Sequence, residues 1–106
     1  MAVCVILCTV PTKAHGRKLA QKLLHQKQVA CVNLILGIES HYWWQDKLEL
    51  SEEVLLIIKT TSRKAKAVTR LILQSHPYEV PEVLVLPVAA GNPTYLKWVA
   101  QSVGKN

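Results

Sequence analysis

The sequence predicts an α+β domain in which strands and helices follow in the order β-α-β-β-α-β, with a short helix at the C-terminus. Apolar residues alternate in some segments and recur at helical spacing in others, and the two kinds of segment follow in that order. Half of the 106 residues are hydrophobic and only 19% are charged, which suits a chain with a packed core. Because this length is typical of one folding unit, we expect residues 1–106 to form a single domain.

The first strand and the first helix are predicted in the N-terminal quarter of the chain. Residues 3–9 are apolar and rich in β-branched side chains, as in a buried strand. Pro11 interrupts this pattern, and Thr12 has the side chain of a helix N-cap. From Lys13 the apolar residues recur at helical spacing, so we expect a helix that ends by Gln28.

A long β-hairpin is predicted from residues 29–44 and 48–60, joined by a short turn. Gly37 is expected to mark a bulge or bend in the first of these strands. Strands of this length outreach an ordinary small sheet, so the distal part either projects into solvent or packs on another subunit. Tyr42, Trp43 and Trp44 lie together near its tip, and three exposed aromatic residues disfavour the solvent alternative.

A second helix, a fourth strand and a short terminal helix complete the predicted fold. The second helix begins at residue 61 or 62 and ends before Pro77. Its expected inward stripe comprises Ala65, Val68, Leu71, Ile72 and Ser75. Residues 83–88 are predicted to form a buried strand, and the run from Tyr95 to Val99 favours the C-terminal helix. This order is that of the ferredoxin-like β-α-β-β-α-β sandwich.

The net charge of +6 is unevenly distributed along the chain. Residues 1–38 carry five basic and no acidic side chains, whereas residues 39–53 carry five acidic and one basic. Basic helices can bind nucleic acid. The aromatic sheet motif of ferredoxin-like RNA-binding domains is missing, however, so we interpret the basic residues as solvated helix faces and predict no nucleic-acid partner.

Hydropathy and cysteine usage bear on the cellular location. No apolar run approaches the roughly 18 to 20 residues that span a bilayer, so direct membrane insertion is not expected. Cys4, Cys8 and Cys31 are odd in number and form no C-x-x-C pair, which disfavours both a disulfide framework and a structural zinc site. A reducing compartment fits best, and we predict a cytoplasmic protein.

Several short segments, spread over residues 3 to 100, together resemble one family. The most specific of them is the segment from His76 to Glu82, because it combines a helix stop with an unusual mixture of polar and aromatic residues. The segments are Leu7-Cys8-Thr9, Ala30-Cys31-Val32-Asn33, Glu39-Ser40-His41-Tyr42-Trp43-Trp44, Lys59-Thr60-Thr61, His76-Pro77-Tyr78-Glu79-Val80-Pro81-Glu82, Gly91-Asn92 and Tyr95-Leu96-Lys97-Trp98. On these segments the chain resembles the CutA divalent-cation tolerance family.

The resemblance implies a non-catalytic homotrimer, built through the long hairpin and linked to tolerance of divalent cations such as copper. Cys8 and His76 stand at positions that resemble those implicated in metal binding by bacterial members, and a thiolate and an imidazole suit a soft metal. No cofactor is firmly predicted, but copper or another divalent cation is the candidate, and its affinity should fall in Cys8→Ala. In the alternative interpretation, Cys8 is a buried hydrophobe and His76 caps the second helix.

A second set of residues is expected to line a ligand cleft between subunits or the trimer interface itself. Interfaces are enriched in Trp and Tyr, which favours the interface, but both roles are compatible. The set comprises Tyr42, Trp43, Trp44, Glu53, Lys59, Tyr78 and Glu79. An alternative function is that of a trimeric sensor of small ligands similar to the PII signal proteins. The sequence contains no known catalytic motif, so no catalytic residues are expected.

Overall fold

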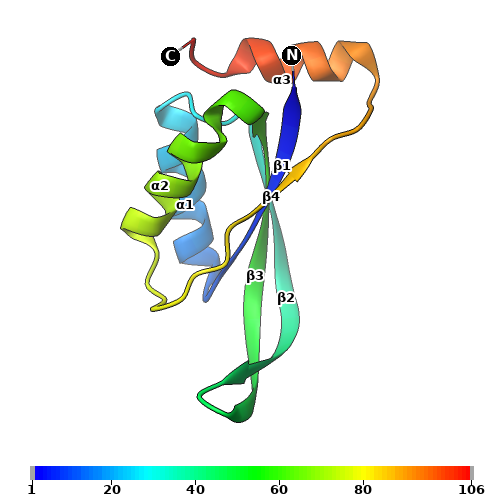
Figure 1. The fold of residues 1–106 in the computed structure, drawn as a ribbon. Coiled ribbons are helices and arrows are strands. Elements are labelled where there is room, and N and C mark those ends of the chain that lie inside the picture. Colours follow the sequence, from blue (N-terminus) through cyan, green and yellow to red (C-terminus); the bar gives the residue numbers. More distant parts are fainter. Residues whose placement is uncertain (1, 106) are drawn as a thin grey trace.

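The computed structural model describes residues 2–105, and within them the predicted order of elements is confirmed. Figure 1 shows the arrangement of the strands and helices. The elements are β1 (Val3–Val10), α1 (Lys13–His25), β2 (Cys31–Trp44), β3 (Lys47–Thr61), a 3-10 turn (Ser62–Lys64), α2 (Ala65–Ser75), β4 (Leu84–Pro87) and α3 (Pro93–Ser102).

The four strands form one antiparallel sheet in the order β2-β3-β1-β4. With β1 and β3 at the centre, this is the ferredoxin-like topology that the sequence predicts. Helices α1 and α2 lie together on one side of the sheet, and α3 lies near the start of β1 (Figure 1). None of the helices described between residues 2 and 105 is long and apolar enough to cross a membrane.

The helix boundaries follow from local chemistry. Thr12 caps α1, because its hydroxyl accepts a hydrogen bond from the backbone N–H of His15 at 3.1 Å. Helix α2 ends at Ser75, one residue before the extended His76. Pro77 requires this end, since proline disfavours the helical conformation in the residue that precedes it.

The hairpin formed by β2 and β3 extends well beyond the other elements and accounts for the elongated shape in Figure 1. The pairing shifts register between Ile35 and Ile38, and Gly37 between them has a φ of +69°, so the predicted bulge is confirmed. Gln45 and Asp46 form the turn, each with positive φ. A two-residue turn with both φ values positive matches the twist of the flanking strands, which sets the hairpin register.

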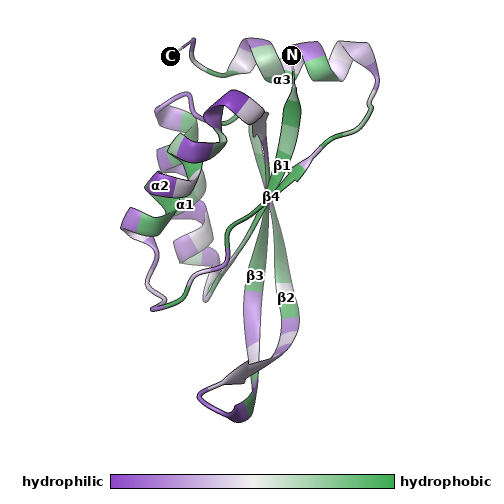
Figure 2. Ribbon diagram, viewed as in Figure 1, coloured by the Kyte–Doolittle hydropathy of each residue, from purple (hydrophilic) through white to green (hydrophobic). Residues whose placement is uncertain are grey.

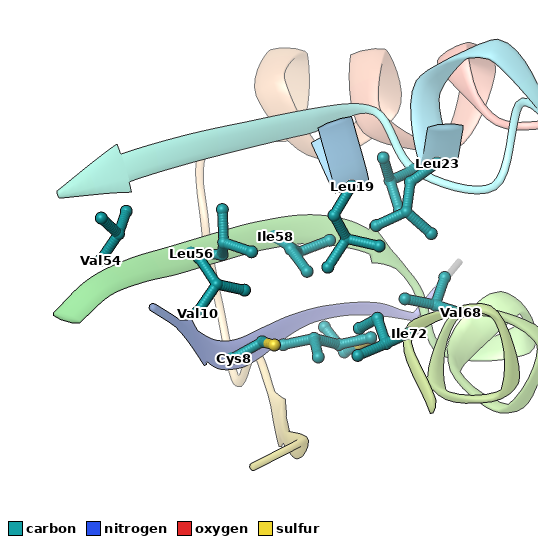
Figure 3. Close-up of a cluster of buried hydrophobic side chains, with 12 residues drawn as sticks. Cys8, Val10, Leu19, Leu23, Val54, Leu56, Ile58, Val68 and Ile72 are labelled. Carbon is teal, nitrogen blue, oxygen red and sulfur yellow. The ribbon is translucent and has the colours of Figure 1, made fainter. Parts of the chain in front are cut away.

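The core lies between the sheet and the pair α1 and α2 (Figure 3). Alternate residues of β1 and β3 point into it, and both helices contribute apolar stripes. Figure 2 shows this pattern, with hydrophobic strands at the centre and hydrophilic residues on the outer helix faces. Its fully buried side chains include Ile6, Cys8, Leu23, Leu56, Ile58, Val68 and Ile72.

Two expectations about burial are wrong. The predicted buried strand at residues 83–88 is the short β4, whose four residues are all exposed, with Leu84 55% exposed. The reason is that β4 pairs only with β1 and forms an edge of the sheet, so one of its sides has no neighbouring strand among the described residues. Ser75 points outward rather than into the core, and its hydroxyl accepts a 2.6 Å hydrogen bond from Nζ of Lys22.

Candidate functional site

A cavity that could hold a ligand lies between the hairpin and the segment that follows α2. Its volume is about 540 Å³, which is the size of a small-molecule site. It brings together six of the seven residues predicted to line a ligand cleft or interface, namely Tyr42, Trp43, Trp44, Glu53, Tyr78 and Glu79. We refer to it as the hairpin pocket.

Glu53 is the buried polar residue of this pocket. Only 8% of it is exposed, and its Oε2 accepts a 2.7 Å hydrogen bond from the hydroxyl of Tyr78. Burial and this bond to a carboxylate raise the pKa of Tyr78 well above its usual value, so the phenol stays protonated and acts as the donor. The bond therefore connects β3 to the segment after α2.

His76 holds that segment against the end of β1. Its Nε2 lies 2.7 Å from the carbonyl oxygen of Thr9, and its Nδ1 lies 3.1 Å from the backbone N–H of Tyr78. Because a carbonyl can only accept, Nε2 carries the proton and Nδ1 accepts from Tyr78. The rings of His76 and Tyr78 also pack at 4.7 Å. Both imidazole nitrogens are thus engaged in structural hydrogen bonds.

Cys8 lies in the core rather than in the pocket. Burial, followed by the negative charges of Glu82 and Glu53, raises the pKa of its thiol to about 12. Its Sγ and the His76 ring both approach the carbonyl of Thr9, at 3.7 Å and 2.7 Å. The two predicted metal donors therefore lie near each other, but one is a protonated thiol and the other has no free nitrogen.

The described part of the chain does not provide a complete site for a divalent cation around this pair. A transition metal needs about four donors, and a thiol binds as its thiolate. Among residues 2–105 no group of three or more His, Cys, Asp or Glu side chains is placed to hold a metal ion. The copper prediction for Cys8 and His76 stays a prediction, and the contacts described here favour their structural roles.

We expect the thiol of Cys8 to be nearly inert towards alkylating reagents at pH 8. With a pKa of about 12, only about one thiol in ten thousand is ionised at that pH. A variant with Cys4→Ala and Cys31→Ser, which keeps Cys8 alone, should react with iodoacetamide roughly a hundredfold faster in guanidinium than when folded. Equal rates in the two states would instead indicate an accessible thiolate that is ready for metal.

Lys59 does not join the hairpin pocket. It lies on the face of the sheet opposite α1 and α2, where its ammonium donates to Oδ1 of Asn33. This open face alternates with the core positions along each strand, and it is apolar at Val5, Leu7, Leu55, Ile57, Leu84 and Leu86. The location of Lys59 on the open face is compatible with a role in an interface but not with a role in the hairpin pocket.

Sequence reasoning did not assign a role to three polar residues that the structure adds to the pocket. Thr9, Ser40 and Glu82 all line it. All three lie in segments that carry the family resemblance, and Glu82 follows Glu79 in the acidic segment after α2, but these signals did not place them in one pocket. Bringing this segment against the hairpin requires the return of the chain from α2 to β4, which no local pattern encodes.

The fold and the pocket define a ferredoxin-like protein with a ligand-sized pocket between a long β-hairpin and the segment that follows α2. The chain belongs to the CutA1 divalent ion tolerance family, whose model matches residues 4–102. It is 44% identical over 99 residues to the divalent-cation tolerance protein CutA of Escherichia coli, covering 93% of this chain and 88% of that protein. It is 45% identical over 98 residues, 92% of this chain, to the rice protein named CutA 1, chloroplastic, and spans 55% of that protein's length.

Solved structures agree with this assignment. The crystal structure of CutA1 from Oryza sativa superposes with a TM-score of 0.96 at 42% identity, covering 100% of this chain and 97% of that one. The CutA1 structure from Thermus thermophilus gives a TM-score of 0.93 at 37% identity, covering 96% and 99%. The long hairpin is thus part of a fold shared over nearly the full length of these chains.

Proposed function

We propose that the protein acts in tolerance of divalent cations as a non-catalytic homotrimer. The family assignment supports the role in cation tolerance, since the relative from Escherichia coli carries this function in its name. The open face of the sheet supports the homotrimer, and it is the observation on which this proposal mainly rests.

The open face is too apolar for a strand surface that remains in water. Leu7 lies at its centre, between Ile57 of β3 and Leu84 of β4. The hairpin adds further exposed apolar side chains, with Trp43 70% and Leu48 71% exposed. Monomeric proteins rarely expose apolar surface of this extent, so a second copy of the chain is its natural cover.

A three-fold ring accounts for both surfaces. In a heterologous ring each subunit offers two different surfaces, and closure leaves none unmatched. Here the hairpin of one subunit would pack on the sheet of the next. Burial of a Trp or Leu side chain contributes about 1.5 to 3 kcal/mol, so assembly and folding would be strongly coupled.

The test is the mass of the wild-type protein by light scattering at several concentrations. We expect a mass near three times the 11.9 kDa of one chain, independent of dilution in the micromolar range. A mass near that of one chain would contradict the trimer. Two chains per particle would contradict the ring.

The location and the alternative function follow from other observations. Cys4, Cys8 and Cys31 are all free, which favours a reducing compartment such as the cytoplasm.

The hairpin pocket favours a second candidate function, the sensing of a small ligand. That function needs neither catalysis nor a bound metal, and the chemistry of the pocket narrows the class of ligand.

A further inference from the structure

We propose that the hairpin pocket binds a small organic cation, an alkylammonium or quaternary ammonium compound. The first observation is the charge of its lining. Three carboxylates line the cavity, those of Glu53, Glu79 and Glu82, and within residues 2–105 no Lys, Arg or His side chain lines it. The pocket is therefore negative although the whole chain carries a net charge of +6.

The second observation is that the charge of Glu53 lacks a counter-ion. Within the described residues no lysine, arginine or histidine nitrogen forms an ion pair with its buried carboxylate. The hydroxyl of Tyr78 satisfies one oxygen, but a hydroxyl is neutral. An uncompensated buried charge is strongly unfavourable. A cation in the adjoining cavity would supply the missing partner.

Neighbouring groups register the same negative field. Glu82 and Glu53 both raise the pKa of Cys8, after the effect of burial. Glu53 also raises the pKa of Tyr78, again after burial. Two groups on different elements thus respond to carboxylates that surround one cavity, and such a field attracts cationic ligands.

The remaining walls are aromatic. Tyr42, Trp43, Trp44 and Tyr78 line the cavity beside the carboxylates. The face of an indole or phenol ring attracts a cation within about 6 Å of its centroid, and tryptophan does so most strongly. Aromatic walls also cover the apolar groups of an organic cation, which a metal ion does not have.

The geometry favours an organic cation over a metal ion. Divalent metals need several donors that converge on one point, and no group of three suitable side chains does so among residues 2–105. A cavity of about 540 Å³ is also far larger than one ion requires. A ligand with one charged end and an apolar body can reach a carboxylate and the aromatic walls together.

The experiment compares choline with 3,3-dimethylbutan-1-ol, in which carbon replaces the charged nitrogen at nearly the same shape. Calorimetry and tryptophan fluorescence would follow binding to the full chain in its native assembly. We expect saturable binding of choline, about tenfold tighter than that of the neutral compound, because only choline has a positive charge that the carboxylates and the aromatic rings attract. Equal affinities, or no binding of either, would overturn the proposal.

Two variants provide the matched comparison. Glu53→Gln removes the charge but keeps an oxygen that can accept from Tyr78, and choline affinity should fall about tenfold. Glu52→Gln neutralises the adjacent, exposed carboxylate, which does not line the pocket, and affinity should be unchanged. Equal losses in both variants would point to general surface charge and overturn the site.

A competition measurement separates the two kinds of cation. We expect Zn²⁺ at micromolar concentration to leave choline binding unchanged, and competitive displacement would assign the pocket to metal and overturn the proposal. Light scattering on the same samples reports the assembly independently. Failure of the trimer would therefore leave the binding result interpretable, and the converse also holds.

Discussion

Replacing Leu7 with glutamate is expected to abolish assembly and to leave particles with the mass of one chain. Leu7 lies at the centre of the open face, opposite both Ile57 and Leu84. In the proposed trimer a carboxylate there would be buried without a partner, at a cost of several kcal/mol at each of three interfaces. Light scattering and size exclusion would measure the change, and circular dichroism would show whether the single chain stays folded.

The control for this variant is Lys66→Glu on the exposed surface of α2. It changes the net charge by more than Leu7→Glu but lies on the opposite side of the sheet, so it should assemble like the wild type. If Leu7→Glu kept the wild-type mass, the open face could not be the interface. Loss of assembly in both variants would indicate a general charge effect instead.

The substitution Ile72→Ala in the core is expected to cause a large loss of stability. Ile72 is fully buried on α2 against the sheet (Figure 3). Truncation removes apolar burial and leaves a cavity, which lowers the free energy of unfolding by about 2 to 5 kcal/mol. Guanidinium denaturation at a fixed protein concentration would measure the change, since any assembly makes apparent stability depend on concentration.

Leu73→Ala offers a control on the same helix. Its side chain is adjacent in sequence but 52% exposed, so we expect a change below about 1 kcal/mol. The pair separates the loss of core packing from any effect of alanine on the helix itself. Similar losses for both variants would mean that the face of Leu73 is also buried, as in an interface that includes α2.

Local patterns in the sequence were sufficient to predict the order of the α-helices and strands, although the second helix was expected from residue 61 or 62 and α2 begins at Ala65, after a 3-10 turn. Pro77 and the Thr12 cap set helix boundaries through effects that act over a few residues. Gly37 marked the bulge because its φ of +69° is a conformation that favours glycine. The apolar, β-branched run over residues 3–9 likewise predicted a buried strand there, and in the structure burial alternates along β1.

The composition of the hairpin pocket was predicted in part. Tyr42, Trp43 and Trp44 were recognised because three adjacent aromatic residues on a long hairpin demand some form of burial. Tyr78 and Glu79 entered through the family resemblance. That Tyr78 donates to Glu53, or that His76 binds the Thr9 carbonyl, depends on contacts across 25 and 67 positions of the chain.

The sequence by itself determined the order of elements, the apolar first strand and the long hairpin with its aromatic tip, because these depend on periodicity and on local backbone preference. Only the tertiary structure decided that β4 is an exposed edge strand and that Lys59 lies on the open face. It also decided that Glu53 is buried in an acidic, aromatic pocket beside the core thiol of Cys8. Strand order and the return from α2 to β4 bring together segments that are distant in the chain, and no local pattern specifies which side chains then meet.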